Sequence, residues 1–268
     1  MRRLILALIF VYGFTSIWAA RVDILAVRSN SMNKNIEVVV ISPDVKKADT
    51  PVIYLLHGYG GNARSWLGLK RDLPEIADRL GVLFVCPDGK NSWYWDSPLN
   101  SSYRYETFVA SELVKHIDAN YPTKKDRSGR AITGISMGGH GAFWIALRHK
   151  ETFGAVGSTS GGVDIRPFPN SWEMNSLLGR RNNNMNVWNR HTVINQTNRI
   201  KNGDLAIIFD CGYDDFFYKV NQDLHMKLRR QQIDHEFYVR PGGHTGDYWR
   251  NSIDYHFLFF TKYFGGRV

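Results

Sequence analysis

The stretch ITGISMGGHGAF, residues 132–143, decides the fold class that we predict for this chain. At its centre lies Gly134-Ile135-Ser136-Met137-Gly138, a serine with a glycine two positions away on each side. A serine on a tight turn between a strand and a helix exposes its hydroxyl at the edge of a sheet, and the glycines relieve crowding in the strained backbone. The pattern therefore predicts that Ser136 is a nucleophile at the carboxyl end of a buried strand.

Apolar runs and helix-like segments alternate on both sides of this turn. Short apolar or β-branched runs, typical of strands, cover residues 36–42, 51–56, 82–86, 131–135, 155–160, 205–209 and 235–239. Segments with helical spacing cover residues 73–80, 105–120, 138–148, 216–232 and 248–264. Strands that alternate with such helices are typical of βαβ units. The predicted fold class is α/β, with a mostly parallel central sheet and helices on both faces.

Length and composition fit one large folded unit. The chain has 268 residues, of which 43% are hydrophobic and 22% charged, which excludes a disordered chain, a collagen-like repeat and a coiled coil. We predict a single catalytic domain over residues 21–268. Residues 162–203, rich in Asn and Arg, interrupt the strand–helix rhythm. A long irregular segment between two strands is usually functional, so we expect a lid-like insertion there.

The N-terminus has the pattern of a secretory signal peptide over residues 1–20. Arg2 and Arg3 precede a short apolar run, and two alanines end the segment. We therefore expect a secreted or periplasmic protein; the alternative is an uncleaved anchor, for which the apolar run is short. The basic residues of the remaining chain are scattered, so we expect neither a nucleic-acid partner nor a stable membrane association.

A serine hydroxyl is a weak nucleophile and needs a base, which in turn needs an acid to hold it. His244 is the best candidate for the base because the glycine-rich turn at residues 240–246 follows the last predicted strand. From that position a side chain can reach over the sheet edge toward Ser136. His225 and His256, by contrast, lie within predicted helices and are interpreted as helix-face residues.

The acid should follow the preceding strand. Three aspartates compete, because Asp210 ends that strand while Asp214 and Asp215 occupy the turn beyond it. We prefer Asp215 as the acid, with Asp214 second. Either side chain could also cap the helix that follows.

A fourth element supports the same chemistry. The sequence His57-Gly58-Tyr59-Gly60-Gly61 follows an apolar strand and is flexible enough to turn a backbone amide toward Ser136. Ester and amide chemistry needs such amides to hold the developing oxyanion. We predict that the amides of Tyr59 and Met137 form this oxyanion hole.

Together these pieces resemble the esterase branch of the α/β-hydrolases that includes S-formylglutathione hydrolase, tributyrin esterase, feruloyl and acetyl-xylan esterase domains and the mycolyltransferases. The resemblance is carried by residues 55–66, 86–97, 132–143, 211–217 and 242–249. It implies the α/β-hydrolase fold and a serine carboxylesterase with Ser136, Asp215 and His244 as its triad. In that family the acid follows a glycine by three positions, which Gly212 fits. The signal peptide departs from the cytosolic S-formylglutathione hydrolases, so glutathione chemistry is not expected.

The family's strand order also bears on the two cysteines. It would place Cys86 and Cys211 at the ends of strands four positions apart, roughly 19 Å, which is far beyond disulfide reach. We predict two free thiols.

The substrate is inferred from the site rim. Trp93 and Trp95 follow a strand end, where exposed rings could stack on a sugar or a phenolic acid; packing beneath the insertion is the alternative. We expect short-chain acyl or aryl esters, acetyl or feruloyl esters of carbohydrates above all. No motif for a metal or a nucleotide occurs, so no cofactor is expected. Two alternatives stay open, an acyltransferase on the same triad and a non-catalytic carbohydrate-binding relative.

Overall fold

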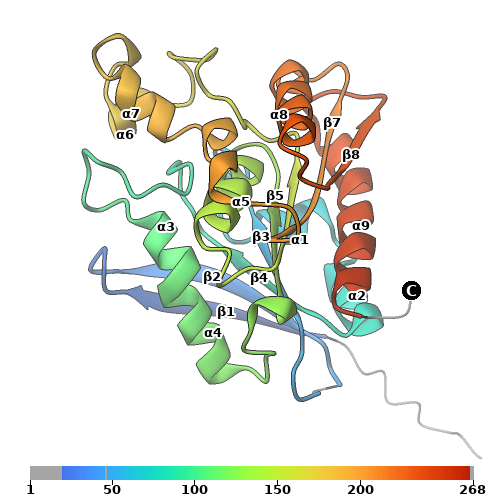
Figure 1. Cartoon of the computed structure of the whole chain (residues 1–268). Coiled ribbons are helices and arrows are strands. Elements are labelled where there is room, and N and C mark those ends of the chain that lie inside the picture. Colours follow the sequence, from blue (N-terminus) through green and yellow to red (C-terminus); the bar gives the residue numbers. More distant parts are fainter. Residues whose placement is uncertain (1–19, 46, 266–268) are drawn as a thin grey trace, which may run out of the picture.

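Eight strands form one sheet in the order β1-β2-β4-β3-β5-β6-β7-β8 (Figure 1). The computed structural model describes residues 20–45 and 47–265, so the predicted signal peptide falls, except for Ala20, outside the described residues. The strands are β1 (Arg21–Ser29), β2 (Lys34–Ser42), β3 (Val52–Leu56), β4 (Leu83–Pro87), β5 (Arg130–Gly134), β6 (Ala155–Thr159), β7 (Ala206–Gly212) and β8 (Glu236–Arg240). β1, β2 and β4 pair antiparallel, whereas the six strands from β4 to β8 run parallel.

Helices cover both faces of the sheet. They are α1 (Ser65–Leu69), α2 (Leu73–Leu80), α3 (Tyr105–Thr107), a π-helical turn (Phe108–Leu113), α4 (Val114–Asn120), α5 (Met137–Arg148), α6 (Met174–Leu178), α7 (Met185–Arg190), α8 (Tyr218–Arg230) and α9 (Gly246–Tyr263). Buried residues of α3 to α5 and of α8 pack on one face, and those of α1, α2 and α9 on the other. The predicted α/β-hydrolase architecture is confirmed.

The central strands are apolar throughout because both of their faces are buried. In β3, Tyr54 and Leu56 belong to one core while Ile53 and Leu55 belong to the other. Side chains alternate between the faces of a sheet, so a strand covered on both sides cannot carry a polar face. The carboxyl ends of the parallel strands meet at one edge, which carries the functional loops.

Several elements differ from the predicted ones, and α1 is among those that were not predicted. β1 was not predicted, although it contains the short apolar run Ile24–Val27; as an edge strand it leaves most of its positions exposed or only partly buried. The helix predicted over residues 105–120 contains the π-helical turn over Phe108–Leu113. β7 continues to Gly212, beyond the predicted end at Phe209.

The insertion over residues 162–203 is more regular than expected. It contains α6, α7 and three-residue 3-10 turns, and it buries Leu177, Trp188 and Val193 in the core. The amide of Asn221 on α8 donates to the carbonyl of Gly161 at 2.8 Å, where the insertion begins. The insertion therefore packs as part of the domain above the carboxyl ends of the strands (Figure 1).

Both cysteines are buried and unpaired, as predicted. Cys86 lies on β4 and Cys211 on β7, and β3, β5 and β6 separate these strands in the sheet. Burial raises the pKa of both thiols, which keeps them protonated.

Candidate active site

Ser136 occupies a strained turn between β5 and α5. Its φ is 56°, in the region that residues other than glycine rarely adopt. Glycine at position 138 allows the turn to close, because a Cβ atom there would lie 2.2 Å from the carbonyl oxygen of Leu56. The Ser136 amide donates to the carbonyl of Thr159 on β6 at 3.0 Å. This turn holds the hydroxyl at the carboxyl edge of the sheet, as the glycine spacing predicts.

A chain of two hydrogen bonds joins Ser136, His244 and Asp215. His244 Nε2 lies 2.9 Å from Ser136 Oγ, and His244 Nδ1 lies 2.8 Å from Asp215 Oδ2. The buried carboxylate can only accept when ionised, so Nδ1 donates to it and Nε2 is left to accept from the hydroxyl. The other carboxylate oxygen, Oδ1, accepts from the amide of Phe217 at 2.8 Å.

The three aspartates have separate environments. Asp215 has a buried carboxylate directed at His244, whereas Asp214 is exposed. Asp210 is buried and contacts His256 rather than His244. The structure therefore brings the preferred acid, and not its two competitors, to the base.

Backbone contacts hold the acid turn against the base turn. The amide of Asp214 donates to the carbonyl of Gly242 at 3.1 Å, and the amide of Tyr213 donates to the carbonyl of Arg240 at 3.2 Å. Gly212 permits this approach, because a Cβ atom there would lie 2.1 Å from the Gly242 oxygen. A larger residue at position 212 would keep the two turns apart, which explains the glycine three positions before Asp215.

The predicted oxyanion donors lie beside the nucleophile. Gly58 is close enough that a Cβ atom on it would be 3.5 Å from Ser136 Cβ, so the loop carrying Tyr59 borders the serine. Within residues 20–45 and 47–265, no acceptor is bonded to the amide of Tyr59 or Met137. Met137 is also the first residue of α5, where the positive end of the helix dipole adds to the attraction for an anion.

The side chains of His57 and Asp88 stabilise the loop that carries Tyr59. The ring of His57 accepts from the Gly89 amide at 2.8 Å and donates through Nδ1 to the Gly58 carbonyl at 2.7 Å. Burial raises the pKa of Asp88, but contacts with His57 and Lys90 outweigh it and lower the value to about 2. His57 is therefore a structural residue of the loop, as its position in the glycine-rich turn suggests.

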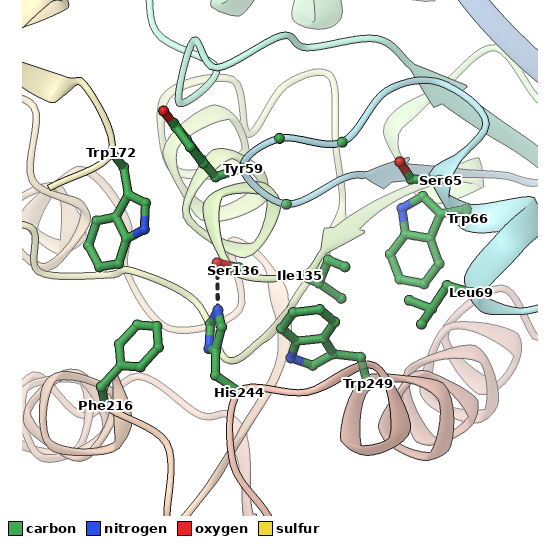
Figure 2. A pocket seen from close by; sticks show the side chains of 13 residues that line it. Tyr59, Ser65, Trp66, Leu69, Ile135, Ser136, Trp172, Phe216, His244 and Trp249 are labelled. Carbon is green, nitrogen blue, oxygen red and sulfur yellow. Dashed lines mark hydrogen bonds between the residues drawn. The ribbon is translucent and has the colours of Figure 1, made fainter.

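A cavity of about 570 Å³ opens beside Ser136 and His244 (Figure 2). Its lining residues are Gly58, Tyr59, Gly60, Gly61, Ser65, Trp66, Leu69, Ile135, Ser136, Trp172, Phe216, His244 and Trp249. Figure 2 shows the Ser136–His244 hydrogen bond at the centre, with Trp172 and Phe216 on one side and Trp249, Trp66 and Leu69 on the other. The Ser136 hydroxyl therefore has an aromatic or apolar wall on each side.

The expected rim role of Trp93 and Trp95 is wrong. Their exposed fractions are 1% and 0%, and neither side chain lines the cavity. The two rings stack on each other at 5.6 Å and cover the ring of His140. Trp93 also contacts Trp172 of the insertion at 5.8 Å, so packing beneath the insertion, the alternative interpretation, describes both residues.

Sequence reasoning missed all four of the Trp and Phe residues that line the cavity, Trp66, Trp172, Phe216 and Trp249. The rings of Trp172 and Phe216 stack at 5.7 Å, and Phe216 is half exposed and lies 4.3 Å from the ring of His244. The position of Phe216 beside Asp215 was a usable signal. Trp172 lies in the insertion, where no periodic pattern indicates which side chains face the site.

Metal sites and membrane-spanning helices were also sought among the described residues. No group of three or more His, Cys, Asp or Glu side chains within residues 20–45 and 47–265 is arranged to hold a metal ion. In the same part of the chain, no helix combines the length and the apolar character needed to cross a membrane.

Comparison with known proteins places this geometry in context. Residues 29–260 match the family described as putative esterase. An acetyl esterase of Caldicellulosiruptor saccharolyticus is 28% identical over 262 residues, covering 87% of this chain and 96% of the relative. A solved ferulic acid esterase superposes with a TM-score of 0.77 at 27% identity, covering 91% of this chain and 98% of that chain. The diacylglycerol acyltransferase/mycolyltransferase Ag85A of Mycobacterium leprae is 33% identical over 153 residues, covering 53% of this chain and 44% of the relative.

Proposed function

The chain belongs to the putative esterase family and is a carboxylic ester hydrolase, and from this premise we propose that it acts through a triad of Ser136, His244 and Asp215. The observation that carries the proposal is the pair of hydrogen bonds from Asp215 through His244 to Ser136, which ends at an open cavity. This arrangement provides a nucleophile, a general base and an orienting acid in hydrogen-bond reach.

The mechanism follows from these contacts. Ser136 Oγ attacks the ester carbonyl carbon while its proton passes to His244 Nε2, and Asp215 stabilises the resulting imidazolium. The amides of Tyr59 and Met137 hold the oxyanion of the tetrahedral intermediate. His244 then returns the proton to the departing alcohol, leaving an acyl group on Ser136. Water enters, gives its proton to His244 and releases the acid by the same steps in reverse order.

We propose acetyl or feruloyl esters of carbohydrates as the substrates. The cavity volume of about 570 Å³ lies in the range that accommodates drug-sized ligands, so it has room for more than an acetyl group. The stacked Trp172 and Phe216 offer a flat surface for a sugar ring or a phenolic ring. The names of two relatives, an acetyl esterase and a ferulic acid esterase, favour the same two acyl groups.

We also propose that the protein is exported, on the basis of the signal-peptide pattern in residues 1–20. Expression of the full chain in a bacterial host, followed by fractionation and N-terminal sequencing, tests this proposal. A mature N-terminus near residue 21 outside the cytoplasm is expected. An intact Met1 in the cytoplasmic fraction would contradict it.

Acyl transfer is the second candidate function, and the similarity to the mycolyltransferase favours it. The same acyl-enzyme would then pass its acyl group to an alcohol instead of water. Product analysis with a sugar alcohol added in excess separates the two functions, since a transferase forms a new ester while a hydrolase releases free acid.

The experiment that tests the proposed function compares the wild type with Ser136→Ala. p-Nitrophenyl acetate, p-nitrophenyl butyrate and a feruloyl ester serve as substrates, and the exposed Ser101→Ala is the matched control. We expect the Ser136 variant to lose turnover by about 10,000-fold or more while the control stays near the wild type. Retained turnover in the Ser136 variant would show that the proposed triad does not carry the reaction.

A further inference from the structure

A second chain of an acid, a histidine and a hydroxyl lies within the core. His256 Nε2 is 2.8 Å from Asp210 Oδ2, and His256 Nδ1 is 2.8 Å from Thr133 Oγ1. None of the three residues is more than 1% exposed, and none lines the cavity beside Ser136. The proposed mechanism uses none of them, so this buried polar chain needs a separate explanation.

Each member of this buried hydrogen-bonded chain lies close in the sequence to one member of the proposed triad. Thr133 lies on β5, shortly before Ser136, and Asp210 lies on β7, shortly before Asp215. His256 lies on α9, the helix that follows the turn carrying His244. The three segments that bear the proposed nucleophile, acid and base are therefore tied together through α9, which packs against β6 and β7 (Figure 1).

A glycine in β6 leaves room for the contact between His256 and Thr133. β6 lies between β5 and β7, and Gly157 is its residue beneath the ring of His256. A Cβ atom at Gly157 would be 2.6 Å from His256 Nδ1 and 2.7 Å from Thr133 Oγ1. The missing side chain thus leaves the space through which His256 reaches β5.

The turn that carries the base is held by the same group. Ser252 on α9 donates to Asp210 Oδ1, and Arg240, the last residue of β8, donates to Ser252 Oγ at 3.1 Å. The guanidinium of Arg240 also lies 3.8 Å from the ring centre of Tyr255. Residues 241–245 are consequently fixed at both ends, by Arg240 on one side and by α9 on the other.

We propose that Thr133, Asp210 and His256 are positioning residues that set the alignment of Ser136, Asp215 and His244. Apolar side chains of equal size would fill this space with a similar or greater gain in stability, since buried polar groups lose their hydration. Hydrogen bonds add directionality that apolar packing lacks, and a displacement of about 1 Å among reacting groups can cost about 100-fold in rate. The proposal rests on the proposed function of the triad.

The test compares Thr133→Val with Thr133→Ser. Valine keeps the shape of threonine but removes the hydroxyl that contacts His256, whereas serine keeps the hydroxyl. kcat and KM for p-nitrophenyl acetate are measured per active site, with sites counted by titration with a fluorophosphonate. We expect kcat of the valine variant to fall about 10- to 100-fold with KM nearly unchanged, and the serine variant to stay within about threefold of the wild type.

Two further variants separate positioning from stability. Thr261→Val removes another buried hydroxyl of α9, one that donates to the Phe257 carbonyl at 2.8 Å away from the triad. It should leave kcat per titrated site unchanged, whichever way the melting temperature moves. Ser252→Ala removes the contacts of this hydroxyl to Asp210 and to Arg240, and it serves if the Thr133→Val protein does not fold. It should lower kcat several-fold.

A double-mutant cycle with Asp215→Asn completes the design. Once the base is misaligned by the loss of its acid, Thr133→Val should cost much less than it does in the wild type. An unchanged kcat per titrated site in folded Thr133→Val, or in Ser252→Ala where Thr133→Val does not fold, would overturn the positioning role. That outcome leaves the proposed triad standing, because the Ser136→Ala comparison tests the triad independently.

Discussion

Replacing Asp215 by asparagine should invert the hydrogen bonding of His244 while leaving the fold intact. The Phe217 amide donates to Asp215 Oδ1, so the single oxygen of an asparagine amide must face Phe217. Its NH2 group would then point at His244 Nδ1, which has to accept. The ring proton moves to Nε2, and Nε2 can no longer take the proton of Ser136.

The size of the effect follows from the geometry. An ionised carboxylate 2.8 Å from the imidazolium contributes about 6 kcal/mol at an effective dielectric constant of about 20. Because about 1.4 kcal/mol corresponds to a tenfold change in rate, the loss of this charge alone corresponds to about 20,000-fold. His244 is partly open to solvent, which weakens the interaction, so we expect kcat to fall about 1,000- to 10,000-fold.

The assay is steady-state hydrolysis of p-nitrophenyl acetate at neutral pH. Asp214→Asn is the matched control, because this neighbouring carboxylate is exposed and should leave kcat within about twofold of the wild type. Circular dichroism and the melting temperature establish that both variants fold. A loss of less than tenfold in a folded Asp215→Asn protein, or an equal loss in both variants, would refute the assignment of the acid.

Four further predictions follow from the described contacts. The pKa of Asp88 is lowered to about 2, so its ionised form stabilises the fold above about pH 4 and this contribution is lost as the pH falls toward 2. The melting temperature of Asp88→Asn should therefore fall less than that of the wild type over this interval; parallel curves would contradict the prediction. Gly138→Ala places a methyl group 2.2 Å from a backbone oxygen of β3, so turnover should be lost and stability should fall by about 1–3 kcal/mol, whereas a variant with wild-type melting temperature and kcat would show that the turn tolerates a side chain. Trp172→Ala should raise KM for a feruloyl ester about tenfold and change the hydrolysis of p-nitrophenyl acetate much less; equal effects on both esters would argue against ring stacking. Cys86 and Cys211 should not react with a thiol reagent in the folded protein and should both react in denaturant, so rapid labelling under native conditions would disprove their burial.

Sequence reasoning located the candidate site because its parts lie at the ends of strands. A buried strand leaves a strong apolar signal, and the residues just after it reach the carboxyl edge of a parallel sheet. Ser136, Asp215 and His244 each follow such a strand, and the structure places them in hydrogen-bond contact. Strand position left Asp214 as the second choice, and the family pattern, in which the acid follows a glycine by three positions, agreed with the preference for Asp215.

The aromatic wall of the cavity could not be predicted in the same way. Trp93 and Trp95 follow a strand end just as Ser136 does, yet the insertion covers them and their rings are buried. Exposure of a ring depends on how a long segment of irregular sequence folds back over it, and no local periodicity records this. Trp172 belongs to the insertion that covers Trp93, so Trp172 lines the cavity and Trp93 does not.

The buried chain through His256 was also beyond the sequence alone. His256 lies on the helix face that packs against the sheet, which matches the prediction of a helix-face residue. Its two partners are separated from it by 46 and 123 positions, so only the sheet order shows that they meet. Gly157, which makes room for the ring, carries no local signal either.

The most direct test of the central claim is covalent labelling with a fluorophosphonate, followed by peptide mapping and an assay of the labelled protein. The account predicts one adduct per chain on Ser136, with ester hydrolysis lost in proportion to labelling and no labelling of Asp215→Asn at a comparable rate. An adduct on another residue, or a fully labelled protein that still hydrolyses esters, would contradict the account.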